Sequence, residues 1–476
     1  MANARLKRAL GFRDLILFYV VSGLSLRWIA TAAATGPSAI AVWFTALCGF
    51  FLPLAACVLD LSSRYPAEGG LYIWTREAFG PFPAFMSAWT YWMSNLPYFP
   101  AILFFAASSL LYLGGPMKRL ADSPLYFLAF TVVMLALITL MNVVGLNTGK
   151  WLNNLGAIGT LIPALILVAL GIISFLRFGS ATHFTVGAMV PRPRMKNFIF
   201  LSTIFFAFGG CEAASFMGEE IREPRRVIPQ SLFLAGFILA VGYIAGTLSL
   251  LVALPPENIS GLSGFMTAID LLARHISLSA LVAPIAALVA ISNIGAASAY
   301  LSSTARLPFV AGVHRYLPAA FGRVHPRFRT PHVALMSYGA AGIVFGVLGQ
   351  AGASIRGAYD MLVAMGVITY FIPYLFLFAS AVRLQSQPLA PESFRLPGGK
   401  RSVVTLAWIG FLSTACTIVL SLFPAEDDAH PTLTFFKIVI MTLVLLVAGV
   451  AIYRSSRSAP QSDSAAPKGK WSPLST

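Results

Sequence analysis

The chain has 476 residues, of which 58% are hydrophobic and only 11% are charged. Soluble domains carry about 25% charged residues. This composition, with a mean hydropathy of +0.79, excludes an ordinary soluble domain and predicts an all-α polytopic membrane protein. The net charge of +16 does not indicate nucleic-acid binding, because the basic residues lie in short loops between apolar segments, where Lys and Arg set topology.

Apolar stretches of about 20 residues, each long enough to cross a bilayer as a helix, recur along the whole chain. We predict twelve spans, at 14–35, 38–60, 82–113, 124–142, 151–176, 198–221, 229–254, 277–310, 332–349, 357–382, 403–423 and 432–453. A basic N-terminus, 1–13, precedes them, and a Ser/Pro/Lys-rich tail, 454–476, is predicted to be disordered. Most loop Lys and Arg fall on the side of the termini. We therefore expect a plasma-membrane protein with both termini cytoplasmic.

The sequence contains no recognisable metal or catalytic motif. The four cysteines lie inside apolar segments without CxxC spacing: Cys48, Cys57, Cys211 and Cys416. We therefore expect no disulfide and no bound metal. HExxH and GxSxG motifs are missing, and no span holds a His/Asp cluster. These observations predict neither a cofactor nor an enzyme.

The segment 205–224, FFAFGGCEAASFMGEEIREP, is the most informative part of the chain. Its apolar run is interrupted by Gly209–Gly210, and Glu212 follows. A carboxylate at the centre of a membrane helix costs roughly 2.5–3.5 kcal/mol on insertion scales. Lipid also cannot satisfy backbone groups that a break releases. We therefore expect this segment to line a hydrated cavity enclosed by protein.

The first span contains a second interruption, at Ser22-Gly23-Leu24-Ser25, followed by Arg27. The two irregular spans are five spans apart, and an odd number would invert the second unit relative to the first. Interrupted spans at matching positions of inverted halves indicate the midplane site of a transporter. We accordingly expect a first inverted repeat over 14–176, a second over 198–382 and two additional spans over 403–453.

Three stretches resemble the amino acid–polyamine–organocation (APC) superfamily: YPAEGGLYIWTREAFGP at 65–81, FAFGGCEAAS at 206–215 and EPRRVIPQS at 223–231. The resemblance implies five-plus-five inverted repeats with discontinuous helices 1 and 6. It also implies secondary transport of amino acids or related amines by alternating access. The chain departs from the family pattern in two places. The first break has a single glycine, and the fifth span lacks a lysine, so proton, sodium or exchange coupling is left open.

Both breaks are candidate substrate contacts. Released N–H groups at a helix N-terminus suit an α-carboxylate, and released carbonyls suit an ammonium group. The predicted binding residues are Ser22, Gly23, Leu24, Ser25, Phe208, Gly209 and Gly210. The resemblance places a gating aromatic residue here, which is either Phe206 or Phe208. The alternative is that small residues merely allow close packing of continuous helices.

Arg27 and Glu212 are the ionisable residues within the two breaks. Glu212 either relays a proton or hydrogen-bonds the loosened backbone. Arg27 pairs with Glu212, replaces a coupling cation, binds an acidic substrate side chain or only reaches an aqueous vestibule. Further polar residues that could line the cavity are Asn95, Tyr98, Asn293 and Ser298, although close helix packing is the favoured role for those on the eighth span.

These inferences favour a plasma-membrane amino acid permease or antiporter. Its expected partners are a small-molecule amino acid, either a proton or a counter-transported amino acid, and the lipid bilayer. A polyamine carrier is the second interpretation, although a polycation requires several carboxylates and Glu212 is the only deep one. A sensor that binds without translocating is the third, and it would normally carry an appended signalling domain.

Overall fold

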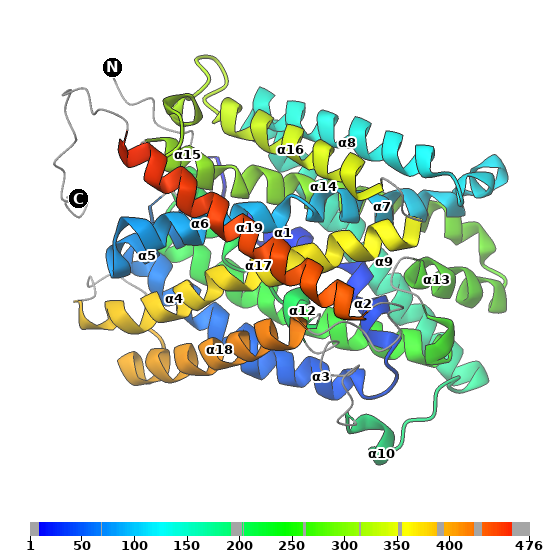
Figure 1. Ribbon diagram of the computed structural model, residues 1–476. Coiled ribbons are helices and arrows are strands. Elements are labelled where there is room, and N and C mark those ends of the chain that lie inside the picture. Colours follow the sequence, from blue (N-terminus) through cyan, green and yellow to red (C-terminus); the bar gives the residue numbers. More distant parts are fainter. Residues whose placement is uncertain are drawn as a thin grey trace.

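The computed structural model describes residues 9–67, 69–191, 202, 204–259, 263–313, 316–350, 355–387, 395–422 and 431–458. Regular structure in these residues is helical, apart from one isolated bridge between Leu10 and Ile221. Figure 1 shows the helices running side by side in one bundle. Helices α5 (Leu71–Phe79) and α15 (Arg306–Val313) lie at one end, and α10 (Val186–Met189) and α13 (Gly264–His275) lie at the other.

Nine helical stretches in the described residues are long and apolar enough to cross a membrane. They comprise α1–α2 (Phe12–Gly23, Leu26–Ala33), α3–η1–α4 (Ala39–Ala46, Leu47–Phe51, Leu52–Arg64), α6–α7 (Pro81–Asn95, Tyr98–Leu110), α8 (Pro124–Val144), α9 (Leu146–Phe178), α12 (Pro224–Ala253), α14 (Val282–Thr304), α17 (Ile355–Arg383) and α18 (Gly399–Ser421). Shorter apolar stretches lie in α16 (His332–Gln350) and α19 (Pro431–Ser458). The all-helical, multi-pass architecture is therefore confirmed.

The remaining expectations about the fold stay predictions. The predicted sixth span, 198–221, falls partly outside the described residues, as does most of the tail at 454–476. The total of twelve spans, the repeat boundaries and the cytoplasmic position of the termini are likewise predictions. Helix α19 runs to Ser458, so the helix extends past the boundary expected at 453.

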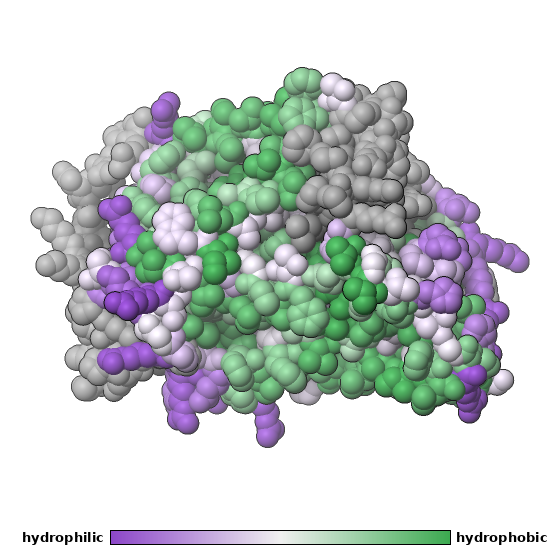
Figure 2. Space-filling model, turned by 90° about the horizontal axis from the view of Figure 1, so that it is seen from below, coloured by the Kyte–Doolittle hydropathy of each residue, from purple (hydrophilic) through white to green (hydrophobic). Residues whose placement is uncertain are grey.

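Burial separates central spans from peripheral ones. In an apolar 18-residue stretch of α1–α2, and in one of α6–α7, 78% is buried inside the protein. The buried share of the corresponding stretch is 33% in α8 and 28% in α18. Figure 2 shows the corresponding surface, a hydrophobic belt between two hydrophilic ends. The peripheral helices therefore present their apolar side chains to lipid, and the central spans are enclosed by protein.

Local sequence explains how the central helices begin, end and approach one another. Pro97 has no N–H to donate, and α6 ends at Asn95 before α7 starts at Tyr98. Helices α9 and α14 meet at Gly156 and Gly295, where an added Cβ on Gly156 would lie 2.6 Å from the Gly295 Cα. Small residues at such a crossing allow two backbones to come this close.

A buried ion pair closes the bundle near α15. Arg306 Nη2 lies 2.8 Å and 2.9 Å from the two carboxylate oxygens of Glu220, and both side chains are 2% exposed. The Glu220 carbonyl also accepts hydrogen bonds from the N–H groups of Ala9 and Leu10, at 3.0 Å and 3.1 Å. Glu220, at the end of the sixth span, thus binds both the eighth span and the segment that precedes α1.

We predict that Arg306→Met destabilises the fold strongly. Removing one partner of a buried pair leaves an uncompensated charge and costs about 3–5 kcal/mol. The matched control is Arg274→Met, because the Arg274–Asp270 pair is largely exposed, with 59% of the Arg274 side chain accessible. Thermal unfolding of purified protein in detergent measures both. Equal melting temperatures for the two variants would contradict the prediction.

Candidate functional site

The predicted break in the first span is present. Helix α1 ends at Gly23, Leu24 and Ser25 are extended, and α2 begins at Leu26. Leu24 still donates its N–H to the Val20 carbonyl at 2.9 Å. The carbonyls of Ser22 and Gly23 and the N–H of Ser25 are bound by side chains of other spans instead, as described below.

The sixth span is broken at the predicted glycines. Residues 204–207 are helical, residues 209–210 are irregular, and the 3-10 helix η4 (Ala213–Glu220) follows. Gly210 has a φ of +105°, a conformation that side-chain-bearing residues rarely adopt. An added Cβ there would lie 2.6 Å from the Tyr300 hydroxyl and 3.5 Å from the Ser22 carbonyl. The two breaks are therefore immediate neighbours.

Tyrosine hydroxyls from two other spans bind the released backbone groups. The Tyr300 hydroxyl, from α14, donates to the Ser22 carbonyl at 2.9 Å. The Tyr243 hydroxyl, from α12, lies 2.5 Å from the Gly23 carbonyl and 3.0 Å from the Ala207 carbonyl, and it accepts the Ser25 N–H at 3.1 Å. Backbone groups of both breaks are thus bound by side chains of other spans.

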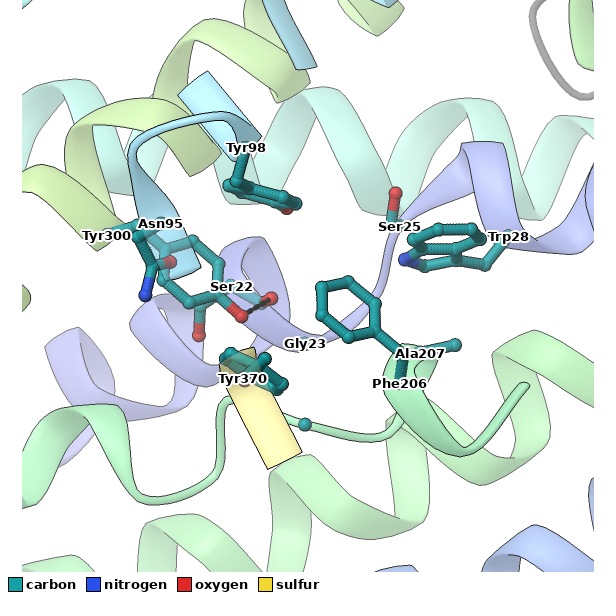
Figure 3. Close-up of a pocket in the computed structure, with 11 residues that line it drawn as sticks. Ser22, Gly23, Ser25, Trp28, Asn95, Tyr98, Phe206, Ala207, Tyr300 and Tyr370 are labelled. Atoms are coloured by element: carbon teal, nitrogen blue, oxygen red, sulfur yellow. Dashed lines mark hydrogen bonds between the residues drawn. The ribbon is translucent and has the colours of Figure 1, made fainter. Parts of the chain in front are cut away.

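A cavity of about 10 Å³, which has room for roughly one water molecule, lies between the breaks. Its lining residues come from spans one, three, six, eight and ten: Ser22, Gly23, Ser25, Trp28, Asn95, Tyr98, Phe206, Ala207, Gly209, Tyr300 and Tyr370. Five of these lining residues are aromatic, and Figure 3 shows their rings around the space beside the first break. The Ser25 hydroxyl is buried and has no hydrogen-bond partner among the described residues. The cavity is thus lined both by aromatic rings and by polar backbone and hydroxyl groups.

Glu212 lies beside this cavity rather than in its wall. Its Oε1 accepts hydrogen bonds from the hydroxyls of Tyr91 at 2.5 Å, Tyr374 at 2.9 Å and Tyr370 at 3.4 Å. Its Oε2 accepts the Gly210 N–H at 3.2 Å. The side chain is fully buried. The carboxylate therefore both stabilises the sixth break and contacts one cavity-lining ring, that of Tyr370.

Arg27 has a different set of neighbours. Its guanidinium carbon lies 4.1 Å from the centroid of the Trp28 ring and 5.4 Å from that of Tyr98. These are cation–π distances, and both rings line the cavity. Among the described residues, no salt bridge joins Arg27 to Glu212. In this conformation the two side chains therefore contact different groups, Arg27 the rings of Trp28 and Tyr98 and Glu212 the tyrosine hydroxyls and the Gly210 N–H.

The structure brings most of the predicted site residues together. Ser22, Gly23, Ser25, Asn95, Tyr98, Phe206 and Gly209 all line the cavity. Of the two candidate gating residues, Phe206 faces the cavity, whereas Phe208 packs edge-on against Trp43 and Tyr243, at 5.3 Å and 5.4 Å. The Leu24 side chain is buried next to Gly242.

The two candidates on the eighth span have packing roles instead. Asn293 donates to the Val289 carbonyl within its own helix, at 2.7 Å. The Ser298 hydroxyl accepts from the Asn142 amide of α8, at 3.0 Å. Neither residue lines the cavity.

Sequence reasoning missed six aromatic residues: Trp28, Tyr91, Tyr243, Tyr300, Tyr370 and Tyr374. Most lie far along the chain from the groups they contact; Tyr243, for example, is 220 residues from Gly23. A tyrosine inside a membrane span is a weak signal, although a buried hydroxyl usually needs a partner.

Comparison with known proteins now decides the family. A family model described as amino acid permease matches residues 10–450. The chain belongs to this family.

Relatives of this permease include transporters with different names. An uncharacterized transporter of Legionella pneumophila is 26% identical over 88% of this chain and 91% of its own length. A probable agmatine/putrescine antiporter of Lactococcus lactis is 30% identical over 50% of each chain. The crystal structure of MhsT in complex with L-phenylalanine has a TM-score of 0.63 at 13% identity, and it covers 88% of the permease and 99% of MhsT. At this identity, the last comparison shows the fold alone.

We predict that Gly210→Ala impairs the permease. Its φ of +105° and the nearby Tyr300 hydroxyl both oppose a Cβ, and such strain costs of order 1–3 kcal/mol. The expected result is a lower melting temperature and reduced transport. Gly187→Ala is the control, because nothing lies within 4 Å of a Cβ at Gly187. Wild-type stability and transport in Gly210→Ala would contradict the assignment of the break.

Proposed function

We propose that this permease carries amino acids across the plasma membrane by alternating access, as a secondary active permease or exchanger. The observation that carries the proposal is the cavity between the two helix breaks, where the Ser25 hydroxyl has no partner among the described residues. A buried polar group without a partner is costly. A substrate bound in a conformation in which this cavity is wider would supply the missing hydrogen bond.

The first break suits the α-carboxylate of the substrate. Helix α2 begins at Leu26, and its N-cap residue, Ser25, makes no side-chain capping bond. The N-terminus of a helix carries partial positive charge and favours anions. A carboxylate beside Ser25 would accept a hydrogen bond from the serine hydroxyl and would lie at the N-terminus of α2.

The opposite wall suits the rest of an amino acid. The α-ammonium group would lie toward the backbone of Ala207 and Gly209, and the side chain toward Trp28, Phe206 and Tyr98. Aromatic faces accept apolar groups and, through cation–π contact, amines. We therefore propose a neutral amino acid as the preferred substrate.

A polyamine is the second candidate, and the similarity to a probable agmatine/putrescine antiporter favours it. A polycation would need negative groups along its length. None of the described residues that line the cavity is Asp or Glu, and Glu212 contacts the lining residue Tyr370 through its hydroxyl group. The lining therefore supports the amino acid over the polyamine.

Coupling is proposed to involve Glu212, because it contacts both the sixth break and a cavity-lining tyrosine. Arg27 is proposed to fix the rings of Trp28 and Tyr98 by cation–π contact. On this proposal Arg27 affects substrate binding indirectly, because it holds two aromatic rings that line the cavity.

Uptake by purified protein in proteoliposomes tests the function. We expect saturable uptake of at least one labelled neutral amino acid, with putrescine and agmatine much weaker. Imposed pH and sodium gradients, and preloading with unlabelled substrate, separate proton coupling, sodium coupling and exchange. Saturable binding without uptake or counterflow would support a sensor, and preferential putrescine uptake would support the polyamine carrier.

Glu212→Gln should abolish the acceleration of uptake by a pH gradient if the carboxylate carries the proton.

We predict that Phe206→Ala and Phe208→Ala have opposite effects on transport and stability. Phe206 lines the cavity, so its truncation should raise the KM or abolish uptake while the melting temperature changes little. Phe208 is fully buried among aromatic rings, and truncating a buried Phe costs about 3–5 kcal/mol, so the melting temperature should fall. The reverse pattern, measured by uptake and thermal unfolding, would contradict the assignment of Phe206 as the gate.

A further inference from the structure

We infer that Tyr243 is a positioning residue that couples the two broken spans through its hydroxyl group. This inference rests on the proposed function, because it concerns the same site. Tyr243 does not line the cavity, and no sequence pattern singled it out.

The hydroxyl of Tyr243 meets three backbone groups from two different spans. It lies 2.5 Å from the Gly23 carbonyl, 3.0 Å from the Ala207 carbonyl and 3.1 Å from the Ser25 nitrogen. A tyrosine hydroxyl has one proton to donate. The two carbonyls therefore share or compete for that proton, while the oxygen accepts the Ser25 N–H. A change at one break alters the hydrogen bond available to the other.

The position of the Tyr243 ring is fixed from both sides. Its ring stacks on Trp43 at 4.3 Å with an interplanar angle of 14°. The Trp43 ring is itself held, because its Nε1 donates to the Thr247 hydroxyl at 2.9 Å. Phe208, which belongs to the sixth break, packs edge-on against Tyr243. The packing of Trp43 and Phe208 against the Tyr243 ring thus holds its hydroxyl between the two breaks.

The position of the hydroxyl also concerns substrate. Ser25 is the N-cap of α2 and lines the cavity, and its N–H is bound by Tyr243. A carboxylate that binds at Ser25 therefore contacts a residue whose amide is held by α12. Binding in the cavity therefore alters the hydrogen bonds of the Tyr243 hydroxyl, and through them the bond to the Ala207 carbonyl of the sixth break.

Tyr243→Phe tests the inference, since it keeps the ring and removes the hydroxyl. Tyr126→Phe is the matched control: the Tyr126 hydroxyl also donates to a carbonyl of another helix, that of Ala107 at 2.9 Å, on the peripheral helix α8. We expect Tyr243→Phe to raise the KM roughly five- to twentyfold with kcat changed less than about twofold. Tyr126→Phe should leave the KM unchanged. An unchanged KM in Tyr243→Phe, or an equal rise in the control, would overturn the inference.

Hydrogen exchange followed by mass spectrometry gives a readout that needs no substrate. Tyr243→Phe should accelerate amide exchange in both segments, 22–26 and 207–211, and Tyr126→Phe in neither. Acceleration in one segment only, or in neither, would show that the hydroxyl does not couple them. If wild-type protein transports no amino acid, the proposed function fails while this measurement still decides the role of Tyr243.

A second variant covers the case in which Tyr243→Phe does not yield folded protein. Thr247→Val removes the acceptor of the Trp43 N–H and loosens the aromatic stack without touching the Tyr243 hydroxyl. It should produce the same paired acceleration at 22–26 and 207–211, with smaller amplitude. Exchange identical to that of the wild type in both segments would count against the inference.

Discussion

The structure depends on one constraint: a backbone group released by a helix break inside a membrane must find its partner within the protein. Each broken span meets this constraint with side chains from a neighbouring span. Tyr243 and Tyr300 bind the carbonyls released in spans one and six. The break in span three follows the same rule, since the Tyr338 hydroxyl of α16 donates to the Trp92 carbonyl at 3.0 Å. Glu212 accepts the Gly210 N–H.

Tyrosine is well suited to this task. Its ring packs among apolar side chains, and its hydroxyl reaches a polar group at the far end. A break completed in this way does not need water, so the irregular segments can remain inside the protein and keep a defined shape. The cost is that each break is tied to the helices that supply its hydroxyls, which are α12, α14 and α16. Any movement of a break must therefore either break these hydrogen bonds or carry the bonded tyrosines with it.

The sequence predicts what is local in this arrangement and leaves out what is distant. Apolar run lengths predicted the all-helical architecture, and the glycines at 23 and 209–210 marked the breaks in spans one and six, because helix interruption is a property of adjacent residues. The sequence could not separate Phe206 from Phe208. They are two residues apart at the point where a helix ends, Phe206 in its last turn and Phe208 just after it, and the packing of Trp43 and Tyr243 around Phe208 distinguishes them. The partners of Arg27 and Glu212 were equally inaccessible, because each depends on contacts with other spans.

Glu212 illustrates how a carboxylate can influence a cavity that it does not line. Tyr370 touches both sides: its hydroxyl is 3.4 Å from the Glu212 carboxylate, and its ring lies 4.6 Å from that of Phe206, which faces the cavity. The Gly210 N–H provides a second connection through the backbone of the sixth break. Protonation of Glu212 would turn one carboxylate oxygen into a donor, at the expense of either the tyrosine hydroxyls on Oε1 or the Gly210 N–H on Oε2. The neighbours that stabilise the buried carboxylate are thus the same groups through which its charge would reach the substrate.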